Sequence, residues 1–520
     1  MTIHTPDWVR DAVFYQIFPD RFAISPRVAK PGPLEPWDAP PTSHGFKGGD
    51  LVGIVEHLPY LQDLGVTALY LTPIFQSASN HRYHTYDYLT VDPLLGGNAA
   101  LRELLDEAHA RDMRVVLDGV FNHTGRGFWA FHHVLENGGQ SPYRDWFHWH
   151  PGALDGRRPI RPYPFAIDVD EAPDEPSLQP TDDPHGDESI RRLGYRAWWG
   201  LPALPKLNTS NPEVREHLLS VAEHWLRFGI DGWRLDVPTE IRDEPFWQEF
   251  RRRCRAINPD AYIVGEIWHE APAWLAGDRF DAVMNYPLAE AILGYVAQGH
   301  LNEPVVRAHH EYGGTVHRRD GAAFGLELER LMGLYDRAVT EVQLNLLGSH
   351  DSPRFRTMAS EDRASYRLAV LHQATLPGAP CTYYGDEVGV AGGNDPECRR
   401  GFPWDEGAWD RDSHAWTRAA FAARHALPAL RRGAFLVAGA TAGAVAFVRD
   451  GDAGGDAVLV AVNAGDEPVE VPAFAPQLGE SMLRDVPLPD TGRGVTISVA
   501  SDGRLAVPLQ PRTGRIMVRA

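Results

Sequence analysis

Cysteine and lysine are scarce in this 520-residue sequence. The three cysteines, Cys254, Cys381 and Cys398, cannot all pair with one another, and no CxxC or Cys/His spacing typical of a metal site occurs. Reduced thiols in a cytoplasmic protein are the simplest interpretation. Only three of the 50 basic residues are lysines, at positions 30, 47 and 206, and we attribute that shortage to codon bias.

Long apolar runs and an excess of positive charge are also missing. No stretch of 18 apolar residues is present, and the first residues do not show the basic segment followed by an apolar run that marks a signal peptide. The 70 acidic residues outnumber the 50 basic ones, for a formal net charge of −20. We therefore expect no membrane and no nucleic-acid partner, because both attract a basic face.

What the sequence does contain is the composition of a folded protein. Hydrophobic residues make up 43% and charged residues 23%, which excludes a disordered, collagenous or coiled-coil chain. At roughly 150 residues per domain, the length predicts three to four domains or one large barrel with attachments. The 15 tryptophans are enough to fill a core and also to line a groove for a neutral ligand.

Eight short apolar runs, each followed by a helical pattern, form the main pattern of the chain. Buried strands that alternate with helices are typical of a parallel sheet, and eight such units close a (β/α)8 barrel, an α/β fold. The runs span residues 12–18, 66–71, 114–120, 232–237, 262–267, 282–286, 342–348 and 380–384.

The helix before the fourth run has the clearest signals. Asn211 is a good N-cap, Pro212 suits the first helical position, and Gly229 ends the helix. Apolar residues at helical spacing between them form one face, which predicts that Trp225 belongs to the core.

Two regions interrupt the alternation and suggest the domain boundaries. Residues 122–200 contain no good βα repeat and are rich in aromatic residues, glycine and proline, whereas residues 433–520 show short β-type runs between Gly/Asp turns. The second region predicts a C-terminal antiparallel β-sandwich. Residues 1–121 and 201–432 are then left for the barrel.

The first of these regions has two interpretations. Between residues 163 and 190 it holds nine carboxylates and no lysine or arginine, as a solvated surface loop would. Alternatively, residues 122–200 form a small excursion domain, inserted after the third strand, over the barrel mouth. Whether residues 151–198 cover an active site is left open by the sequence.

Polar side chains follow four of the eight runs at the point where each strand should end. Catalytic groups of a βα barrel lie at the carboxyl ends of its strands, so we expect these side chains to share one rim. A single aspartate at such a place is often only a helix N-cap, but three carboxylates together are hard to dismiss. The carboxylates are Asp236, Glu266 and Asp351, accompanied by His123, Arg234 and His350.

This set of groups favours glycoside hydrolysis. Cleavage of an acetal bond requires two carboxyl groups, one that protonates the leaving oxygen and one that attacks or activates water. A neutral sugar also suits a groove rich in aromatic residues. Phosphoryl transfer and zinc hydrolysis fit poorly, because no Gly-rich phosphate loop or HExxH motif precedes a helix.

Four segments at these strand ends resemble, in the same order, the signature segments of the α-amylase family of glycoside hydrolases. They read DGVFNH at 118–123, GWRLDV at 232–237, GEIW at 265–268 and SHD at 349–351. The resemblance covers nearly the whole chain and is closest to the branch of neopullulanases, cyclomaltodextrinases and maltogenic amylases. Its markers are LPKLN at 204–208, GEIWHE at 265–270, DAVMNYPL at 281–288 and YYGDEVGVAGGNDPECRR at 383–400.

The resemblance implies a role for each carboxylate. Asp236 would be the nucleophile that forms a β-linked glycosyl-enzyme, and Glu266 would be the acid/base, with a pKa of about 6–7 to serve both steps. Asp351 would hold the 2- and 3-hydroxyls of the distorted sugar. Retention by double displacement follows, with the two catalytic carboxyls roughly 5–5.5 Å apart.

The resemblance also implies roles for residues beside the reacting centre. Arg234 would keep the nucleophile ionised, and His123 and His350 would hydrogen-bond the sugar hydroxyls. Tyr83 aligns with the family's stacking tyrosine, and Trp268 would either stack on the leaving sugar or pack in the core. Structural roles near the site are implied for Asp87, Asp118 and Asn122.

Two departures from the branch concern assembly and metal binding. Members usually begin with an additional β-domain that supports dimerisation, whereas the first barrel strand begins near residue 12 here, so we expect any homodimer to form by another route. Many relatives bind calcium in the loop after the first strand, but residues 21–30 contain no carboxylate or amide. Glu240 stands where classical amylases have a calcium-binding histidine. We predict that the chain needs no metal and no other cofactor.

The resulting functional hypothesis is an enzyme that cleaves α-1,4-glucosidic bonds of a neutral α-glucan, namely short or cyclic maltooligosaccharides or pullulan. Cleavage of α-1,6 bonds and transfer to sugar acceptors stay open, since a covalent intermediate partitions between water and sugar. A transglycosylase or isomerase on the same fold is therefore the alternative. The presence of all three carboxylates disfavours an inactive glucan-binding protein.

Overall fold

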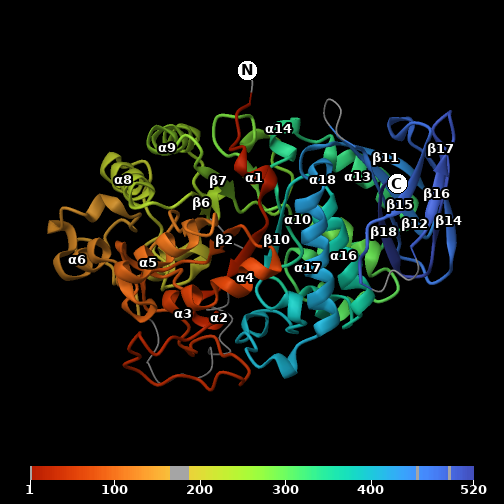
Figure 1. Cartoon of the computed structure of the whole chain (residues 1–520). Helices are drawn as coiled ribbons and strands as arrows, with labels where there is room; N and C mark the ends of the chain where they lie inside the picture. The colour runs from red at the N-terminus through yellow and green to blue at the C-terminus, as the bar shows by residue number, and fades with distance from the viewer. Residues whose placement is uncertain (1–2, 164–186, 452–455, 490–493) are drawn as a thin grey trace.

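The computed structural model describes residues 3–163, 187–451, 456–489 and 494–520. Figure 1 shows the barrel with the C-terminal strands, in blue, on one side and α6 (Trp129–Asn137) on the opposite side. These two flanks are the two places where the sequence interrupts its βα alternation.

Eight parallel strands form the barrel, one from each predicted run. Their order in the sheet is β8-β7-β6-β5-β2-β1-β10-β9, and a parallel bridge between Met284 and Leu344 links the two ends of that order. All strand residues except Arg114 are buried, which explains the continuous apolar runs. The strands are β1 (Phe14–Ile17), β2 (Ala68–Leu71), β5 (Arg114–Gly119), β6 (Gly232–Leu235), β7 (Tyr262–Gly265), β8 (Ala282–Val283), β9 (Leu344–Leu346) and β10 (Ala379–Tyr383).

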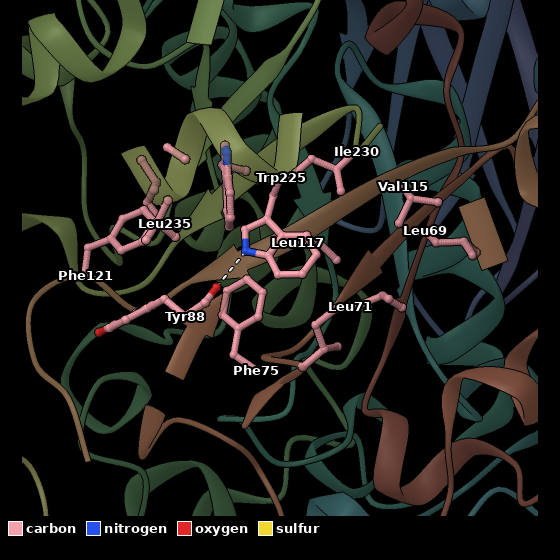
Figure 2. Close-up of a cluster of buried hydrophobic side chains, with 14 of the residues drawn as sticks. Leu69, Leu71, Phe75, Tyr88, Val115, Leu117, Phe121, Trp225, Ile230 and Leu235 are labelled. Atoms are coloured by element: carbon pink, nitrogen blue, oxygen red, sulfur yellow. Dashed lines mark hydrogen bonds between the residues drawn. The ribbon is translucent and has the colours of Figure 1, made fainter. Parts of the chain in front are cut away.

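Helix α8 (Pro212–Phe228) begins and ends as the sequence predicts. The Asn211 side chain accepts hydrogen bonds from the first free backbone N–H groups, and Gly229 ends the helix with φ 116°, in the left-handed region. Trp225 on its inner face is fully buried, and its indole N–H donates to the Tyr88 carbonyl at 2.7 Å (Figure 2). Its ring also stacks on Phe75, with 5.1 Å between centroids, so this tryptophan is a core residue.

The other helices connect the strands and cover the outside of the barrel. They are α1 (Trp8–Asp11), α2 (Pro19–Phe22), α3 (Leu51–Glu56), α4 (Leu58–Leu64), α5 (Gly97–His109), α9 (Glu244–Ile257), α10 (Tyr286–Val296), α11 (Glu303–Arg307), α12 (Tyr312–Thr315), α13 (Gly321–Met332), α14 (Arg337–Thr340), α15 (Phe355–Met358), α16 (Arg363–Thr375), α17 (Arg411–Ala426) and α18 (Pro428–Arg432).

The described part of residues 122–200, which we call the excursion, lies between β5 and α8. It contains α6 and α7 (Asp187–Leu193) and is held by isolated bridges, two of which join Trp149 to Tyr195 and Ala197 to Pro205. Residues 164–186 lie outside the described residues, and with them most of the acidic stretch. A hairpin that the run analysis missed, β3 (Phe75–Ser77) with β4 (Thr85–Val91), precedes the excursion in the chain.

Antiparallel sheets form the C-terminal region, as predicted. One sheet has the order β11-β12-β13-β18-β15-β16, and β14 pairs with β17 in a second. Alternate side chains meet between the two sheets in a separate apolar core. The strands are β11 (Ala434–Ala440), β12 (Ala444–Asp450), β13 (Val458–Asn463), β14 (Val469–Phe474), β15 (Ser481–Asp485), β16 (Thr496–Val499), β17 (Arg504–Leu509) and β18 (Thr513–Arg519).

The structure also bears on the cysteines and on membrane-spanning segments. Cys254, Cys381 and Cys398 are buried and unpaired, in agreement with the prediction of free thiols. Within the described ranges, no helix combines the length and apolar character needed to cross a bilayer.

Candidate active site

The three predicted carboxylates follow three strands of the barrel at its carboxyl rim. Asp236 comes directly after β6 and Glu266 directly after β7, and each continues the strand ladder with one more backbone hydrogen bond, to the carbonyls of Gly119 and Leu235. Asp351 lies in the loop after β9. All three side chains line one cavity of about 620 Å³. Because the carboxyl ends of all barrel strands meet at one rim, residues that are far apart in the sequence lie close together there.

Arg234 connects the groups at the centre of this rim. One of its terminal nitrogens, Nη1, lies 2.8 and 2.9 Å from the Asp118 oxygens and 3.2 Å from Asp236 Oδ1. The other, Nη2, lies 3.0 Å from Glu266 Oε2. Because Arg234 is fully buried, its guanidinium holds three carboxyl groups in a place that water does not screen. The prediction gave Arg234 a contact with Asp236, and the structure adds the contacts with Asp118 and Glu266.

Asp236 presents one oxygen to Arg234 and keeps the other available. Its buried Oδ2 has no hydrogen-bond partner among the described residues. The next residue, Val237, has φ 34° and ψ 53°, a left-handed conformation that a β-branched side chain rarely adopts. The Val237 N–H donates to Glu266 Oε2 at 3.0 Å, so this strained turn fixes the nucleophile and the acid/base relative to each other.

The pKa values of the two carboxyls are both raised. Burial, and next the negative charge of Glu266, raise the pKa of Asp236, while Arg234 opposes the shift. Burial raises the pKa of Glu266, again against Arg234. Because the two groups interact, they titrate as a pair, and the pair keeps one proton at a pH where an isolated carboxyl would have lost it. A site with one proton and one negative charge is what general acid and nucleophile require.

Asp351 is held by positive or polar neighbours. Burial opposes its ionisation, but His350 at 2.9 Å and Arg399 at 3.1 Å outweigh burial and lower the pKa of Asp351. His350 is itself fixed by Gln16 at 2.8 Å and by the Tyr83 hydroxyl at 2.6 Å. The Tyr83 ring also stacks on His350, at 5.4 Å and 8°.

Trp268 combines the two alternatives that the sequence left open. One face of its ring packs on Tyr286, 3.6 Å away and nearly parallel at 10°. The indole N–H donates to Glu266 Oε1 at 3.2 Å, and the half-buried side chain lines the cavity. Trp268 is therefore packed against the core and presented to a ligand beside the acid/base.

Six predicted residues do not line the cavity, although three of them, Asp118, Arg234 and His350, contact side chains that do. His123 is fully buried behind Trp198, which stacks on it at 4.9 Å and 8°, and its Nε2 lacks a hydrogen-bond partner in the described parts of the chain. Asn122 is buried beside it, with its amide 3.3 Å from His123 Nδ1. Asp87 lies in the β4 strand, where it accepts hydrogen bonds from the Leu89 N–H and the Thr90 hydroxyl. The structural role predicted for Asp87 fits these local contacts; the sugar contact of His123 stays a prediction.

Several lining residues were missed by the sequence reasoning. They lie on irregular loops, where neither periodicity nor a strand end points to them, although WWG at 198–200 is an aromatic pair that could have drawn attention. Burial lowers the pKa of His81 and brings that of His84 to about 4, so these lining histidines are neutral near pH 7. The missed residues are His81, Trp198, Trp199, His309, His310, Asn394, Asp395 and Arg399.

In the loop where no calcium site is predicted, the side chain of Lys30 supplies a positive charge. Asp50 is fully buried, and its Oδ1 accepts the hydrogen bond that caps α3. Its Oδ2 lies 3.0 Å from the ammonium group of Lys30 and accepts the Ser25 N–H at 3.0 Å. In the residues that the structure describes, no three His, Cys, Asp or Glu side chains group as metal ligands. That the chain needs no metal stays a prediction.

Comparison with known proteins identifies the family. Residues 16–425 match the alpha amylase, catalytic domain, family. A cyclomaltodextrinase of Geobacillus thermopakistaniensis (strain MAS1) is 42% identical over 90% of this chain and 71% of its own length. The crystal structure of a debranching enzyme from Nostoc punctiforme superposes with a TM-score of 0.83 at 42% identity, covering 100% of both chains.

A third relative is a cyclic α-maltosyl-(1→6)-maltose hydrolase from Arthrobacter globiformis, with a TM-score of 0.78 and 36% identity over 99% of this chain and 100% of that one. Both these structures and the family model extend over the strands that carry Asp236, Glu266 and Asp351. The fold, the carboxylate rim and these matches agree, and the chain belongs to the α-amylase family of glycoside hydrolases.

Proposed function

We propose that this protein hydrolyses α-glucosidic bonds of short or cyclic maltooligosaccharides with retention of anomeric configuration. The observation that carries the proposal is the contact of one buried guanidinium, that of Arg234, with both Asp236 and Glu266 at the barrel rim. Such an arrangement supplies a nucleophile and a proton donor to the same glycosidic bond.

The reaction proceeds in two displacements. Protonated Glu266 gives its proton to the glycosidic oxygen while Asp236 Oδ2, the oxygen not bound to Arg234, bonds to the anomeric carbon and the leaving sugar departs. Glu266, now a carboxylate, takes a proton from water; the water oxygen bonds to the anomeric carbon and the bond to Asp236 breaks. Glu266 ends protonated and Asp236 ionised, as at the start.

The remaining groups suit a neutral sugar. Asp351, which His350 and Arg399 keep ionised, accepts hydrogen bonds from sugar hydroxyls, which strengthen as the ring distorts towards the transition state. Uncharged His81 and His84 offer hydrogen bonds without adding charge to the cavity. The Trp268 ring offers an apolar face to the leaving sugar.

The substrate is the finer part of the proposal. The names of three relatives favour short or cyclic glucans with α-1,4 bonds as the substrate and α-1,6 bonds as a second candidate linkage. They are cyclomaltodextrinase, debranching enzyme and cyclic α-maltosyl-(1→6)-maltose hydrolase. We further propose that the enzyme acts in the cytoplasm and needs no calcium.

A product time course tests the proposal. Purified enzyme is incubated separately with a cyclomaltodextrin, pullulan, starch and maltotriose, and products are followed by chromatography and by proton NMR of the anomeric signals. We expect faster turnover of the small or cyclic substrates and the α-anomer as the first product. A β-anomer formed first would contradict double displacement, and equal rates on starch and cyclomaltodextrin would contradict the preference for small substrates.

A further inference from the structure

Four aromatic rings form a row from the excursion to the opposite rim of the barrel. His123 stacks on Trp198, Trp198 stacks on Trp199 at 5.2 Å and 17°, and Trp199 meets the edge of His310 at 5.4 Å and 79°. His310 belongs to the segment between α11 and α12, which follows β8 in the chain. We call Trp198, Trp199 and His310, which all line the cavity, the aromatic bridge.

Trp199 adopts a backbone conformation that a tryptophan rarely takes. Its φ of 50° and ψ of 23° lie in the left-handed region, where a side chain crowds the backbone and glycine is favoured. Residues in such conformations persist where their surroundings hold them, and they are concentrated at binding sites. Here the conformation places a half-buried indole between the excursion and the barrel rim.

The bridge lies on the leaving-group side of the acid/base. His310 is 6.4 Å from Trp268, and the Trp268 indole donates to Glu266. The sugar that becomes attached to Asp236 must lie towards Asp351, His350 and Tyr83, whereas the departing sugar leaves past the proton donor. Trp199 and His310 are therefore placed to contact sugar units beyond the one next to Glu266.

We propose that Trp199, supported by His310, forms a subsite for an acceptor or leaving maltooligosaccharide and sets the partition of the glycosyl-enzyme between sugar and water. The inference rests on the proposed function. A pyranose ring has an apolar C–H face that covers an indole, and the His310 side chain, 57% exposed, offers a polar edge beside it. In the second displacement the acceptor hydroxyl gives its proton to Glu266, its oxygen bonds to the anomeric carbon, and the bond to Asp236 breaks.

The test uses α-maltosyl fluoride as donor and maltose as acceptor. Fluoride is too small to reach the bridge, so the first displacement reports only on the other side of the cavity. Trp199→Gly removes the indole and suits the left-handed backbone, while Trp199→Phe keeps an aromatic ring. We expect Trp199→Gly to lower the ratio of transfer to hydrolysis about three- to tenfold, and kcat/KM on maltopentaose by a similar factor. Its loss of kcat/KM on α-maltosyl fluoride should be smaller than its loss on maltopentaose, and Trp199→Phe should retain most of the transfer.

Trp129→Gly is the matched control, because Trp129 also belongs to the excursion, is 43% exposed and does not line the cavity. Thermal melting of all variants shows that they fold. An unchanged transfer ratio together with unchanged kcat/KM on maltopentaose in Trp199→Gly would overturn the inference, as would the same losses in Trp129→Gly. If the unaltered enzyme does not turn over α-maltosyl fluoride at all, the proposed function itself fails.

Discussion

The two sides of the cavity are built in different ways. On the side that holds the sugar to be transferred, Asp351, His350 and Tyr83 form a network of hydrogen bonds and ion pairs that continues to the buried Asp118 and Arg234. On the leaving-group side, half-buried and exposed rings on loops contact one another through their faces and edges. The first side is fixed by barrel strands and buried charges, the second by loop packing.

This difference separates chemistry from selection. A buried charge network tolerates little change, because removal of one member leaves another charge unpaired away from water. Ring contacts between loops are individually weak. Their loss should therefore have a larger effect on the preference between sugars than on the rate of bond cleavage. Variants on the two sides should therefore differ in the size and in the kind of their effects.

The largest effect is expected for Asp236→Asn. The amide cannot form the glycosyl-enzyme, so we expect kcat to fall by at least about three orders of magnitude. The melting temperature should change little, since the variant is nearly isosteric. Asp87→Asn, in the β4 strand away from the cavity, is the control. A near-normal rate in Asp236→Asn would refute the assignment of the nucleophile.

Arg234→Lys should have the second-largest effect, after Asp236→Asn. Lysine keeps the positive charge but cannot contact Asp118, Asp236 and Glu266 from one planar group. We expect kcat/KM to fall about 100-fold, with a loss of thermal stability. Initial rates and melting curves measure both. A loss of stability without a loss of rate would show that Arg234 has a structural role and no role in the reaction.

The raised pKa of the carboxyl pair predicts the pH dependence. The pair must hold one proton, on Glu266, when the reaction starts, so activity should fall as the pH rises through the raised pKa at which the pair loses that proton, and it should fall at low pH, where the pair binds a second proton. The Trp268 indole donates to Glu266 and favours its charged form. Trp268→Phe should therefore raise that pKa and move the alkaline limb of kcat/KM to higher pH by about half a unit. A move to lower pH would contradict this role.

The smallest effect is expected from metal removal. Lys30 supplies the positive charge beside buried Asp50, so a chelator should change the melting temperature by less than about 1 °C. Lys30→Met should lower it by a few degrees, because Asp50 then lacks its ion-pair partner. A large drop with the chelator would show that the fold depends on a metal after all.

The two sides also differ in how far the sequence predicts them. The eight strands were predicted because runs buried on both faces are continuously apolar, and a rim rule then places Asp236, Glu266 and Asp351 together. Helix α8 was predicted by its caps and its periodicity. The motifs that resemble the α-amylase family point to these same residues, and the family matches confirm that resemblance.

The leaving-group side could not be predicted in this way. Trp199 and His310 lie on loops whose course depends on tertiary contacts, and a positive φ at a tryptophan has no local sequence signal. The extent of Arg234 contacts was missed for a related reason, since alternation along β6 shows its proximity to Asp236 but not the approach of Glu266 from the neighbouring strand.

Trapping of the covalent intermediate tests the central claim most directly. The enzyme is incubated with a 5-fluoro-α-glycosyl fluoride, which forms the glycosyl-enzyme faster than it is hydrolysed, and the labelled peptide is identified by mass spectrometry. The account predicts one added glycosyl group, attached to Asp236. A label on Glu266 or Asp351, or release of the sugar without any covalent intermediate, would contradict it.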